Sequence, residues 1–287
     1  MMRMGIIGAE NSHTAAIAKL LNEDKAVKGF QVTHLWGESP TFVKASQAKV
    51  EIPHVVKKPA DMLGEVDCVM VDHRHGKHHL KAVTPFVKEK VPVFVDKPMS
   101  TSLAECKRFL ALRKRKRTPV VTMSSIPHQS CVKTIKKQLK DVGEVKAVHL
   151  MGPGDPKSKY GGVFFYGIHQ ADLMVELCGP GAQQVSAVRN GASMTATVTY
   201  PENLNVTISM VPAGGGFRLA ASGAKGGFYE PIVSDKNAYL VTTKIFTRMF
   251  RTRKEPFTEE RMLAPIAVLT AMDKSLKEKR PIKVPKV

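Results

Sequence analysis

The chain has 287 residues, enough for two domains and for a sizeable apolar core that needs no disulfides or structural metal. Its hydrophobic content of 43% and charged content of 24% are typical of a soluble globular protein, and no apolar run approaches the ~20 residues of a membrane helix. The formal net charge of +19 is high, which is compatible with nucleic-acid binding or with attraction of an anionic cofactor or substrate.

The four cysteines, Cys68, Cys106, Cys131 and Cys178, are scattered and form no C-x-x-C pair. This pattern indicates buried thiols in a reducing cytosol, not a disulfide framework or a zinc site. Polar residues from Glu10 onward interrupt the apolar N-terminus before a signal peptide could form. We therefore expect a cytoplasmic protein without a membrane segment.

Basic residues cluster over residues 113–117, 248–254 and 274–286. Such clusters favour nucleic-acid binding, but aromatic residues make up only 6% of the chain and no nucleic-acid module signature is present. We therefore expect a solvated basic surface that attracts anionic ligands, and nucleic acid is kept as a remote alternative.

The first half of the chain predicts strands that alternate with helices. The strands lack a clean apolar–polar alternation, which indicates a parallel sheet covered on both faces. Strands are expected over residues 3–9, 29–36, 66–71, 93–95 and 119–124, and helices over 12–22, 42–48, 80–88 and 102–112, with a further helical turn over 59–63.

A glycine turn follows the first predicted strand and opens the first helix. A strand, a glycine turn and a helix begin a dinucleotide-binding unit, in which backbone N–H groups approach a diphosphate at the positive end of the helix. Gly8 fits the tight turn, but Glu10 stands where a second glycine is expected and His13 where a small third residue is expected. The pattern is equally typical of a plain strand–helix turn.

Glu38 lies just past the second predicted strand. An acid in this place can hydrogen-bond the adenosine ribose hydroxyls, which favours NAD over NADP. A loop acid that helps to cap the helix starting near Thr41 is an equally good interpretation.

A histidine-rich loop, Asp72-His73-Arg74-His75-Gly76-Lys77-His78-His79, follows the third predicted strand. Two of its histidines stand four residues apart, so on a helix they would share a face as metal ligands can. No carboxylate motif or cysteine pair accompanies them, and we expect a loop that lines a cofactor or substrate, without a metal.

The stretch over residues 91–100, V-P-V-F-V-D-K-P-M-S, predicts a short buried strand that delivers Asp96 and Lys97 at its C-terminal end. Pro98 stops the strand because it has no N–H donor. Ligands bind beyond the C-terminal ends of strands in open parallel sheets. Lys97 is therefore either a structural ion-pair partner or a reactive-site cation.

The second half of the chain predicts a different architecture. Strands joined by short turns imply a mainly antiparallel sheet with one face on a helix and the other solvated or in an oligomer interface. Strands are expected over residues 145–150, 184–188, 194–200, 204–211, 217–222 and 239–243, and helices over 132–139, 164–177 and 258–277. The predicted fold class is α/β: a Rossmann-type domain over residues 1–124, then an α+β domain with an open sheet over 125–287, whose last helix could pack back on the first domain.

This order of parts resembles the Gfo/Idh/MocA oxidoreductase family, and the resemblance covers nearly the whole chain. Three motifs carry it: G-I-I-G-A with its following helix, V-F-V-D-K-P, and Gly167-Ile168-His169-Gln170-Ala171-Asp172. The second is similar to the family's E-K-P motif, with Asp96 in place of glutamate, and the third matches its G-x-H-x-x-D helix. The spacing of His79 from the second motif also fits the family's loop histidine.

The resemblance implies a hydride transfer between a nicotinamide and a hydroxyl or carbonyl carbon of a sugar, polyol or related small molecule. Lys97 would stabilise charge on the reacting oxygen, His169 would be the general base or acid, and Tyr166 is a further catalytic candidate. The substrate would contact Lys97, Tyr166, His169 and Asp172. NAD or NADP, with NAD favoured, would be bound by Gly8, Ala9, Glu10, Asn11, Ser12, His13, Glu38, Asp72, His73, His79, Asp96 and Lys97.

Two positions depart from the family pattern. Family dehydrogenases often carry an aspartate four residues before the motif histidine, where this chain has Phe165, and Glu10 replaces a glycine. Both departures motivate an alternative: a nucleotide-binding sensor or subunit with the same fold and no redox chemistry. We also expect a homodimer or homotetramer formed through the C-terminal sheet.

Overall fold

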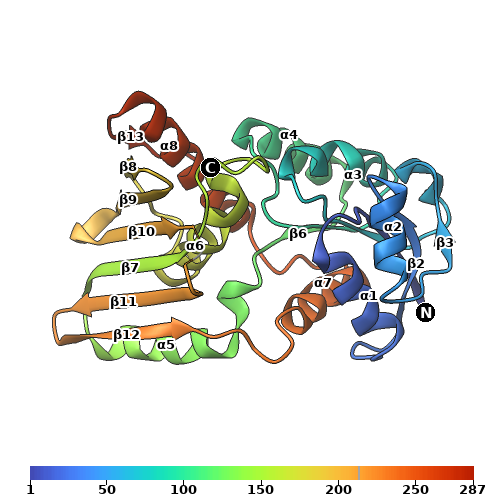
Figure 1. Cartoon of the computed structure of the whole chain (residues 1–287), viewed down its shortest axis with the longest axis horizontal. Helices are drawn as coiled ribbons and strands as arrows, with labels where there is room; N and C mark the ends of the chain where they lie inside the picture. The colour runs from blue at the N-terminus through green and yellow to red at the C-terminus, as the bar shows by residue number, and fades with distance from the viewer. Residues whose placement is uncertain (213) are drawn as a thin grey trace. The chain divides into compact units, whose positions relative to one another are not determined.

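The computed structural model describes residues 1–212 and 214–287, and the chain divides into two compact units (Figure 1). The first unit comprises Met1–Ser100, Ala104–Met123 and Tyr239–Thr258. The second comprises Thr101–Leu103, Ser124–Ala238 and Glu259–Val287. Each unit is built on one sheet, and the first unit recruits a segment from late in the chain.

The first unit holds a six-stranded parallel sheet in the order β3-β2-β1-β4-β5-β6. The strand order reverses between β1 and β4, which is the place where open α/β sheets bind ligands at their C-terminal edge. This sheet confirms the predicted Rossmann-type fold. Its strands are β1 Met2–Ile7, β2 Phe30–Trp36, β3 His54–Val55, β4 Cys68–Val71, β5 Val93–Val95 and β6 Val120–Thr122.

Helices cover both faces of this sheet, and in Figure 1 α3 and α4 lie above the strands while α1 and α7 lie below. The core between α1, α2, α7 and the sheet is apolar, with Ile17, Leu21, Phe94 and Phe246 almost fully buried. The helices are α1 Ser12–Asn22, α2 Pro40–Gln47, α3 His79–Lys88, α4 Leu103–Lys116 and α7 Leu240–Thr252.

Helix α7 corrects the strand predicted over residues 239–243. The run Y-L-V-T-T is rich in β-branched residues and favours a strand by local propensity. In the structure Thr243 donates its hydroxyl hydrogen bond to the Tyr239 carbonyl at 2.8 Å, within the first turn of the helix. Phe246 stacks on Phe94 at a centroid distance of 4.6 Å, so tertiary packing on the first sheet overrides the local preference.

The end of α7 and the chain that follows it form hydrogen bonds near the starts of three strands of the first sheet. Arg251 donates to the Lys28 carbonyl before β2, and Arg253 donates to the Lys90 carbonyl before β5. Glu255 accepts from the Val120 N–H at the start of β6 and pairs with Arg113. These bonds explain why Tyr239–Thr258 belongs to the first unit, and they give Arg113 of the basic run a structural partner.

The second unit holds a seven-stranded sheet in the order β12-β11-β7-β10-β9-β8-β13. Only β7 and β10 pair in parallel, and all other pairs among the described residues are antiparallel, as the sequence predicts. The prediction missed β3, β12 and β13. The strands are β7 Val145–Pro153, β8 Gln184–Asn190, β9 Ser193–Thr199, β10 Asn205–Val211, β11 Phe217–Gly223, β12 Gly226–Ile232 and β13 Ile282–Lys283.

Three helices belong to this unit: α5 Ser130–Asp141, α6 Val163–Cys178 and α8 Glu259–Glu278. Helix α6 packs against α8 and against strands β7 and β10. Gly167 permits this approach, because a Cβ there would lie 2.2 Å from the Met210 Cε atom. The glycine of the G-x-H-x-x-D motif therefore lets α6 lie close to β10, which fixes where His169 is placed.

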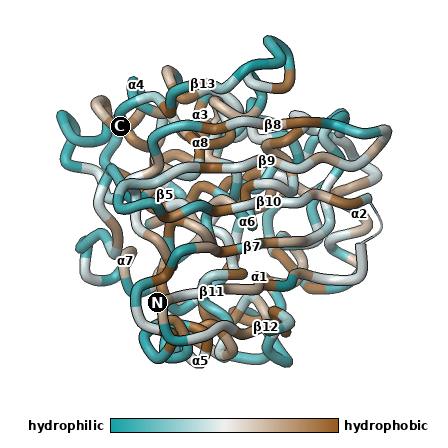
Figure 2. Tube along the Cα trace, turned by 90° about the vertical axis from the view of Figure 1, so that its left-hand side faces the viewer, coloured by the Kyte–Doolittle hydropathy of each residue, from teal (hydrophilic) through white to brown (hydrophobic). Residues whose placement is uncertain are grey.

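The other face of the second sheet carries small polar side chains. Figure 2 views this sheet with β8, β9, β10, β7, β11 and β12 crossing the picture one below the other. Thr197 of β9 lies opposite Thr207 of β10 and Ser186 of β8. The residues that alternate with these along each strand are buried on the opposite face, which the helices cover. The predicted one-sided burial of this sheet is confirmed.

Among the residues that the structure describes, no helix is long and apolar enough to cross a membrane. No group of three or more His, Cys, Asp or Glu side chains in the described ranges could hold a metal ion. All four cysteines are free thiols.

Candidate active site

The loop after β1 is shaped by a close approach to the end of β4. Gly8 has a φ of +129°, and a Cβ at this position would lie 2.3 Å from Asp72 Oδ1 and 2.9 Å from the His73 nitrogen. Only glycine avoids both the strain and the collision. The sequence prediction that Gly8 makes the tight turn is therefore explained by its neighbour Asp72.

Glu38 occupies the backbone donors of this loop. Its Oε2 accepts from the Ala9 N–H at 2.8 Å and from the Glu10 N–H at 3.1 Å. Its Oε1 is buried and has no hydrogen-bond partner among the described residues. Ser39, not Glu38, caps α2, because its hydroxyl accepts from the Phe42 N–H. The helix-capping interpretation of Glu38 is therefore wrong.

Asp96 is the centre of a buried charged cluster at the end of β5. Its Oδ2 lies 3.0 Å from His13 Nδ1, 3.2 Å from Asn11 Nδ2 and 4.0 Å from Lys97 Nζ. Burial works to raise the pKa of Asp96, but the charges of His13 and Lys97 outweigh it and hold the pKa well below its usual range. Asp96 is thus an ionised anchor that joins the loop after β1 to Lys97.

His13 has a partner that the sequence did not reveal. Its ring lies 4.7 Å from the ring of Tyr239, the residue that precedes α7. A large third residue is therefore accommodated in the glycine loop because it bridges Asp96 and Tyr239. Ser12, the first residue of α1, is exposed.

His79 clamps the histidine loop to the strand end. Its Nδ1 lies 2.9 Å from the Pro98 carbonyl oxygen and its Nε2 lies 2.8 Å from the His73 carbonyl oxygen. Burial lowers the pKa of His79 by more than the charge of Asp96 and these two hydrogen bonds raise it. The ring is therefore neutral and can donate to only one of the two carbonyls. Each ring nitrogen faces a carbonyl oxygen, so neither is open to a metal.

His73 lies between Trp36 and His79. Its ring centroid is 5.5 Å from the Trp36 ring and 5.9 Å from the His79 ring. Burial, and then the neighbouring His79 and His78, lower the pKa of His73 to about 3. The His73 ring is therefore neutral, and it lies beside Trp36, the only tryptophan of the chain.

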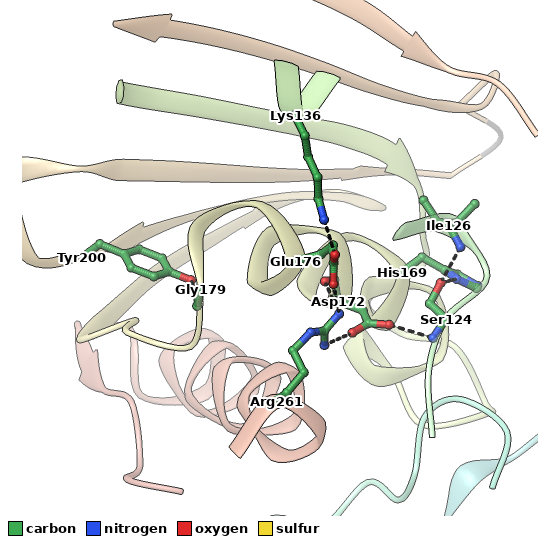
Figure 3. A network of polar contacts seen from close by, with 9 residues as sticks. All are labelled: Ser124, Ile126, Lys136, His169, Asp172, Glu176, Gly179, Tyr200 and Arg261. Atoms are coloured by element: carbon green, nitrogen blue, oxygen red, sulfur yellow. Dashed lines mark hydrogen bonds and ion pairs between the residues drawn. The ribbon is translucent and has the colours of Figure 1, made fainter. Parts of the chain in front are cut away.

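His169 is held by a serine in the second unit (Figure 3). Its Nδ1 lies 2.7 Å from the hydroxyl oxygen of Ser124, and the same oxygen accepts from the Ile126 N–H at 3.1 Å. Because a hydroxyl both donates and accepts, Ser124 can serve either tautomer of the ring. No local pattern in the sequence indicated Ser124, since 45 residues separate it from His169.

Two aromatic rings flank His169. The Tyr166 ring lies 5.5 Å from it edge-on, and the Phe217 ring lies 5.6 Å from it edge-on. Tyr166 is 39% exposed, and the Phe165 ring packs edge-on against it with 5.1 Å between the ring centroids. Tyr166 therefore presents its ring to His169, while Phe165 supplies packing where a carboxylate was expected.

Asp172 is a structural member of the same network. Its Oδ2 accepts from the Ser124 N–H at 2.7 Å, and its Oδ1 pairs with Arg261 of α8 (Figure 3). Arg261 also reaches Glu176, which Lys136 of α5 pairs from the other side. Both carboxylate oxygens of Asp172 are used within the network, so this residue positions Ser124.

Charge balance makes this network stable at neutral pH. Burial raises the pKa of Glu176, but the bonds from Lys136 and Arg261 outweigh it and the net pKa is lowered. Burial likewise lowers the pKa of Arg261, but Asp172 and Glu176 outweigh it and the net pKa is raised. The sequence did not predict Arg261, because it lies on another helix 89 residues from Asp172.

The N-terminal part of the chain is similar to a known protein family. The model for an oxidoreductase family with an NAD-binding Rossmann fold, GFO_IDH_MocA, matches residues 2–124. No curated protein matches the sequence.

Solved structures share the fold of the whole chain. A probable dehydrogenase from Thermotoga maritima is 19% identical, with 99% of each chain covered and a TM-score of 0.84. The myo-inositol dehydrogenase of Lactobacillus casei, in complex with NAD(H) and myo-inositol, is 16% identical, with 100% of this chain and 98% of that chain covered and a TM-score of 0.85. The scyllo-inositol dehydrogenase of the same organism, with NAD(H) and scyllo-inositol, is 13% identical, with 99% of each chain covered and a TM-score of 0.85.

These likenesses confirm the predicted two-part fold class. The unit that carries the glycine loop and Lys97 is the part that the family model matches. The N-terminal domain, over residues 2–124, therefore matches the Gfo/Idh/MocA family of oxidoreductases with an NAD-binding Rossmann fold.

Proposed function

We propose that this protein is an NAD(P)-dependent dehydrogenase that transfers a hydride between the nicotinamide and a CH–OH carbon of a polyol, sugar or related compound. The observation that carries the proposal is Lys97, a cation 9% exposed at the C-terminal end of a central strand in an NAD-binding domain. The inositol dehydrogenases that share the fold point to a cyclic polyol as the substrate class.

The residues present fit a dinucleotide. Gly8 makes the tight turn that a side chain would block, because a Cβ there would collide with Asp72, and α1 begins without a side-chain cap and without an acid in its first turn. Helix N–H groups of this kind favour an anionic diphosphate. The buried, unpartnered Oε1 of Glu38 is an acceptor suited to ribose hydroxyls.

The cofactor, when bound, supplies the hydride chemistry, and the chain supplies charge and a proton path. Lys97 stabilises negative charge that develops on the reacting oxygen, an electrostatic role that is strongest in a buried site. Asp96, ionised and held by His13, keeps the Lys97 ammonium oriented beside the loop after β1.

His169 is the proposed proton donor and acceptor. As a base, His169 accepts the proton at Nε2 while its Nδ1–H donates to Ser124. The imidazolium formed in this way is the acid of the reverse reaction, and its Nδ1–H still donates to Ser124. The Ser124 hydroxyl lies 2.7 Å from Nδ1 and supports both states.

Turnover separates this function from a non-catalytic one. Glu38 on the loop donors and Phe165 in place of a carboxylate favour a second candidate, a nucleotide-binding sensor without redox chemistry. We expect NAD reduction with at least one member of a panel of inositols, sugars and linear polyols, followed by absorbance of the reduced cofactor. Tight NAD binding with no turnover across the panel would leave the sensor as the function.

Cofactor preference depends on Glu38. A carboxylate there accepts ribose hydroxyls and repels the extra phosphate of NADP, so we expect tighter binding of NAD. In Glu38→Ala the preference for NAD falls by roughly tenfold, the value of a hydrogen bond to a charged group. Calorimetric titration of both nucleotides measures this ratio, with Glu51→Ala as an exposed control. Tighter NADP binding by the native chain would contradict the assignment.

The uncovered face of the second sheet is the proposed interface of a homodimer or homotetramer. Thr197 is exposed on β9, in the inner part of that face, and α6 and α8 lie on the opposite side. An arginine at this position would place a charge inside the proposed interface, twice in a two-fold dimer, which costs desolvation. We expect Thr197→Arg to sediment as a smaller species than the native protein, while Thr41→Arg on α2 sediments unchanged. An unchanged mass for Thr197→Arg would place the interface elsewhere.

A further inference from the structure

Asp72 is a fully buried acid beneath the dinucleotide loop. It follows β4 directly, has no exposed surface, and its Oδ1 points at Gly8, where an added Cβ would lie 2.3 Å away. This Oδ1 has no hydrogen-bond partner among the described residues. An ionised carboxylate in such a place would hold an uncompensated charge, which proteins avoid.

The hydrogen bonds of Thr14 indicate where a proton lies. The Thr14 hydroxyl oxygen is 3.0 Å from the Gly8 carbonyl oxygen and 2.7 Å from Asp72 Oδ2. A hydroxyl has one proton, and a carbonyl oxygen can only accept. With Asp72 ionised, the single Thr14 proton would have to be shared between the two acceptors. With Asp72 protonated, Thr14 donates to Gly8 and Asp72 donates to Thr14, so each contact has its own proton. The geometry therefore favours a neutral Asp72.

The surrounding charges act in the same direction. Burial raises the pKa of Asp72 well above its ordinary value, and Asp96 at the end of β5 and Glu38 at the end of β2 raise it further. A bond donated by Thr14 to the ionised carboxylate would lower the pKa, as the charge of Lys97 does, but these effects are smaller than those that raise it. The adjacent His73 ring is neutral, because burial lowers its pKa to about 3. Asp96 is ionised and Asp72 is not, although both lie in one cluster.

We propose that the folded chain keeps Asp72 protonated and that this neutrality permits an anionic dinucleotide to bind at the loop from Gly8 to His13. An ionised Asp72 would add a negative charge beneath the diphosphate and break the Thr14 bond that fixes the Gly8 turn. Dinucleotide affinity is therefore linked to a proton held by Asp72. The ligand in this inference rests on the proposed function, but the proton itself is a property of the free protein.

The free protein tests the proton first. A buried protonated carboxyl gives its own C=O stretching band in the infrared spectrum, and we expect one at neutral pH that disappears in Asp72→Asn. Asparagine keeps the shape and donates an N–H to Thr14, so its fold is preserved. Asp24→Asn, an exposed acid on the same unit, is the matched control and keeps the band. A spectrum without a band that depends on Asp72 overturns the proposal, whether or not the protein binds NAD.

Stability against pH gives a second readout. A raised folded pKa contributes stability that is fully present below the unfolded value of about 3.8 and is lost as the pH rises through the folded pKa. As the pH rises from about 3.8 through the folded pKa of Asp72, the free energy of unfolding of the native protein should therefore fall relative to that of Asp72→Asn. Parallel pH curves for the two proteins would contradict a proton on Asp72.

Binding completes the test. Trp36, the only tryptophan, lies 5.5 Å from the ring of His73 next to Asp72, so its fluorescence can report NAD binding without turnover. We expect the native dissociation constant to rise by roughly tenfold or more as the pH passes the Asp72 pKa, and that of Asp72→Asn to stay nearly constant. A native affinity with the same pH dependence as that of Asp72→Asn overturns the link to binding. Absence of NAD binding in both proteins at every pH overturns the link to binding together with the proposed function, and the infrared band still decides the proton.

Discussion

Replacement of Lys97 by methionine is expected to lower kcat/KM by about 10²–10³-fold while NAD affinity changes only a few-fold. Methionine keeps most of the side-chain volume and removes the charge that stabilises the reacting oxygen. The neighbouring acid, Asp96, keeps His13 and Asn11 as partners, so the loop after β1 stays anchored. Steady-state kinetics with the best polyol of the panel and calorimetric titration of NAD measure the two effects separately.

A fall in kcat/KM with nearly unchanged NAD affinity distinguishes a catalytic role of Lys97 from a role in binding the cofactor. Lys44→Met, an exposed lysine on α2, is the matched control and should match the native rate. His169→Asn is expected to lose roughly 10²–10⁴-fold and to flatten the pH profile of kcat, because the titrating imidazole is gone. If Lys97→Met weakened NAD binding a hundredfold and left kcat unchanged, Lys97 would be a cofactor ligand and the chemistry would need another electrophile.

Local sequence patterns predicted most of the first sheet because each strand and helix there satisfies its own preferences. The helix over Ser12–Asn22 has the predicted bounds, and so does the strand Val93–Val95. Helix α7 escaped prediction because its threonines and valine favour a strand locally, and only its packing on Phe94 decides otherwise. That contact joins residues far apart in the chain, and no short window of sequence contains it.

The candidate site shows the same limit. The glycine loop and Asp96-Lys97-Pro98 are recognisable because they follow predicted strands, and the His169 helix is recognisable from its resemblance to the G-x-H-x-x-D motif. The partners that set their chemistry lie elsewhere: His13 for Asp96, Ser124 for His169, and Thr14 for Asp72. Each of these pairs joins two different elements, so its existence depends on the finished packing.

Arg261 contributes to the stability of the second unit through two ion pairs. It is 16% exposed and bonds two carboxylates, Asp172 and Glu176. Arg261→Met is expected to lower the free energy of unfolding by about 3–5 kcal/mol, because it leaves Asp172 as a buried charge whose cation is gone. Urea unfolding followed by circular dichroism measures the loss. Arg280→Met is the control: its pair with Glu278 is 62% exposed on the arginine side, and we expect less than about 1 kcal/mol.

A double variant separates the ion pair from simple loss of packing. In Arg261→Met with Asp172→Asn the stranded charge is absent, so we expect the loss to be smaller than the sum of the two single losses. The pH dependence should change as well. Glu176 has a lowered pKa, so its contribution to stability is present above its unfolded pKa and is lost as the pH falls. Arg261→Met should lose part of this acid sensitivity, while Lys136 still holds Glu176. Additive losses with an unchanged acid limb would mean that Arg261 acts through its methylene groups, and that Asp172 holds Ser124 and His169 in place without it.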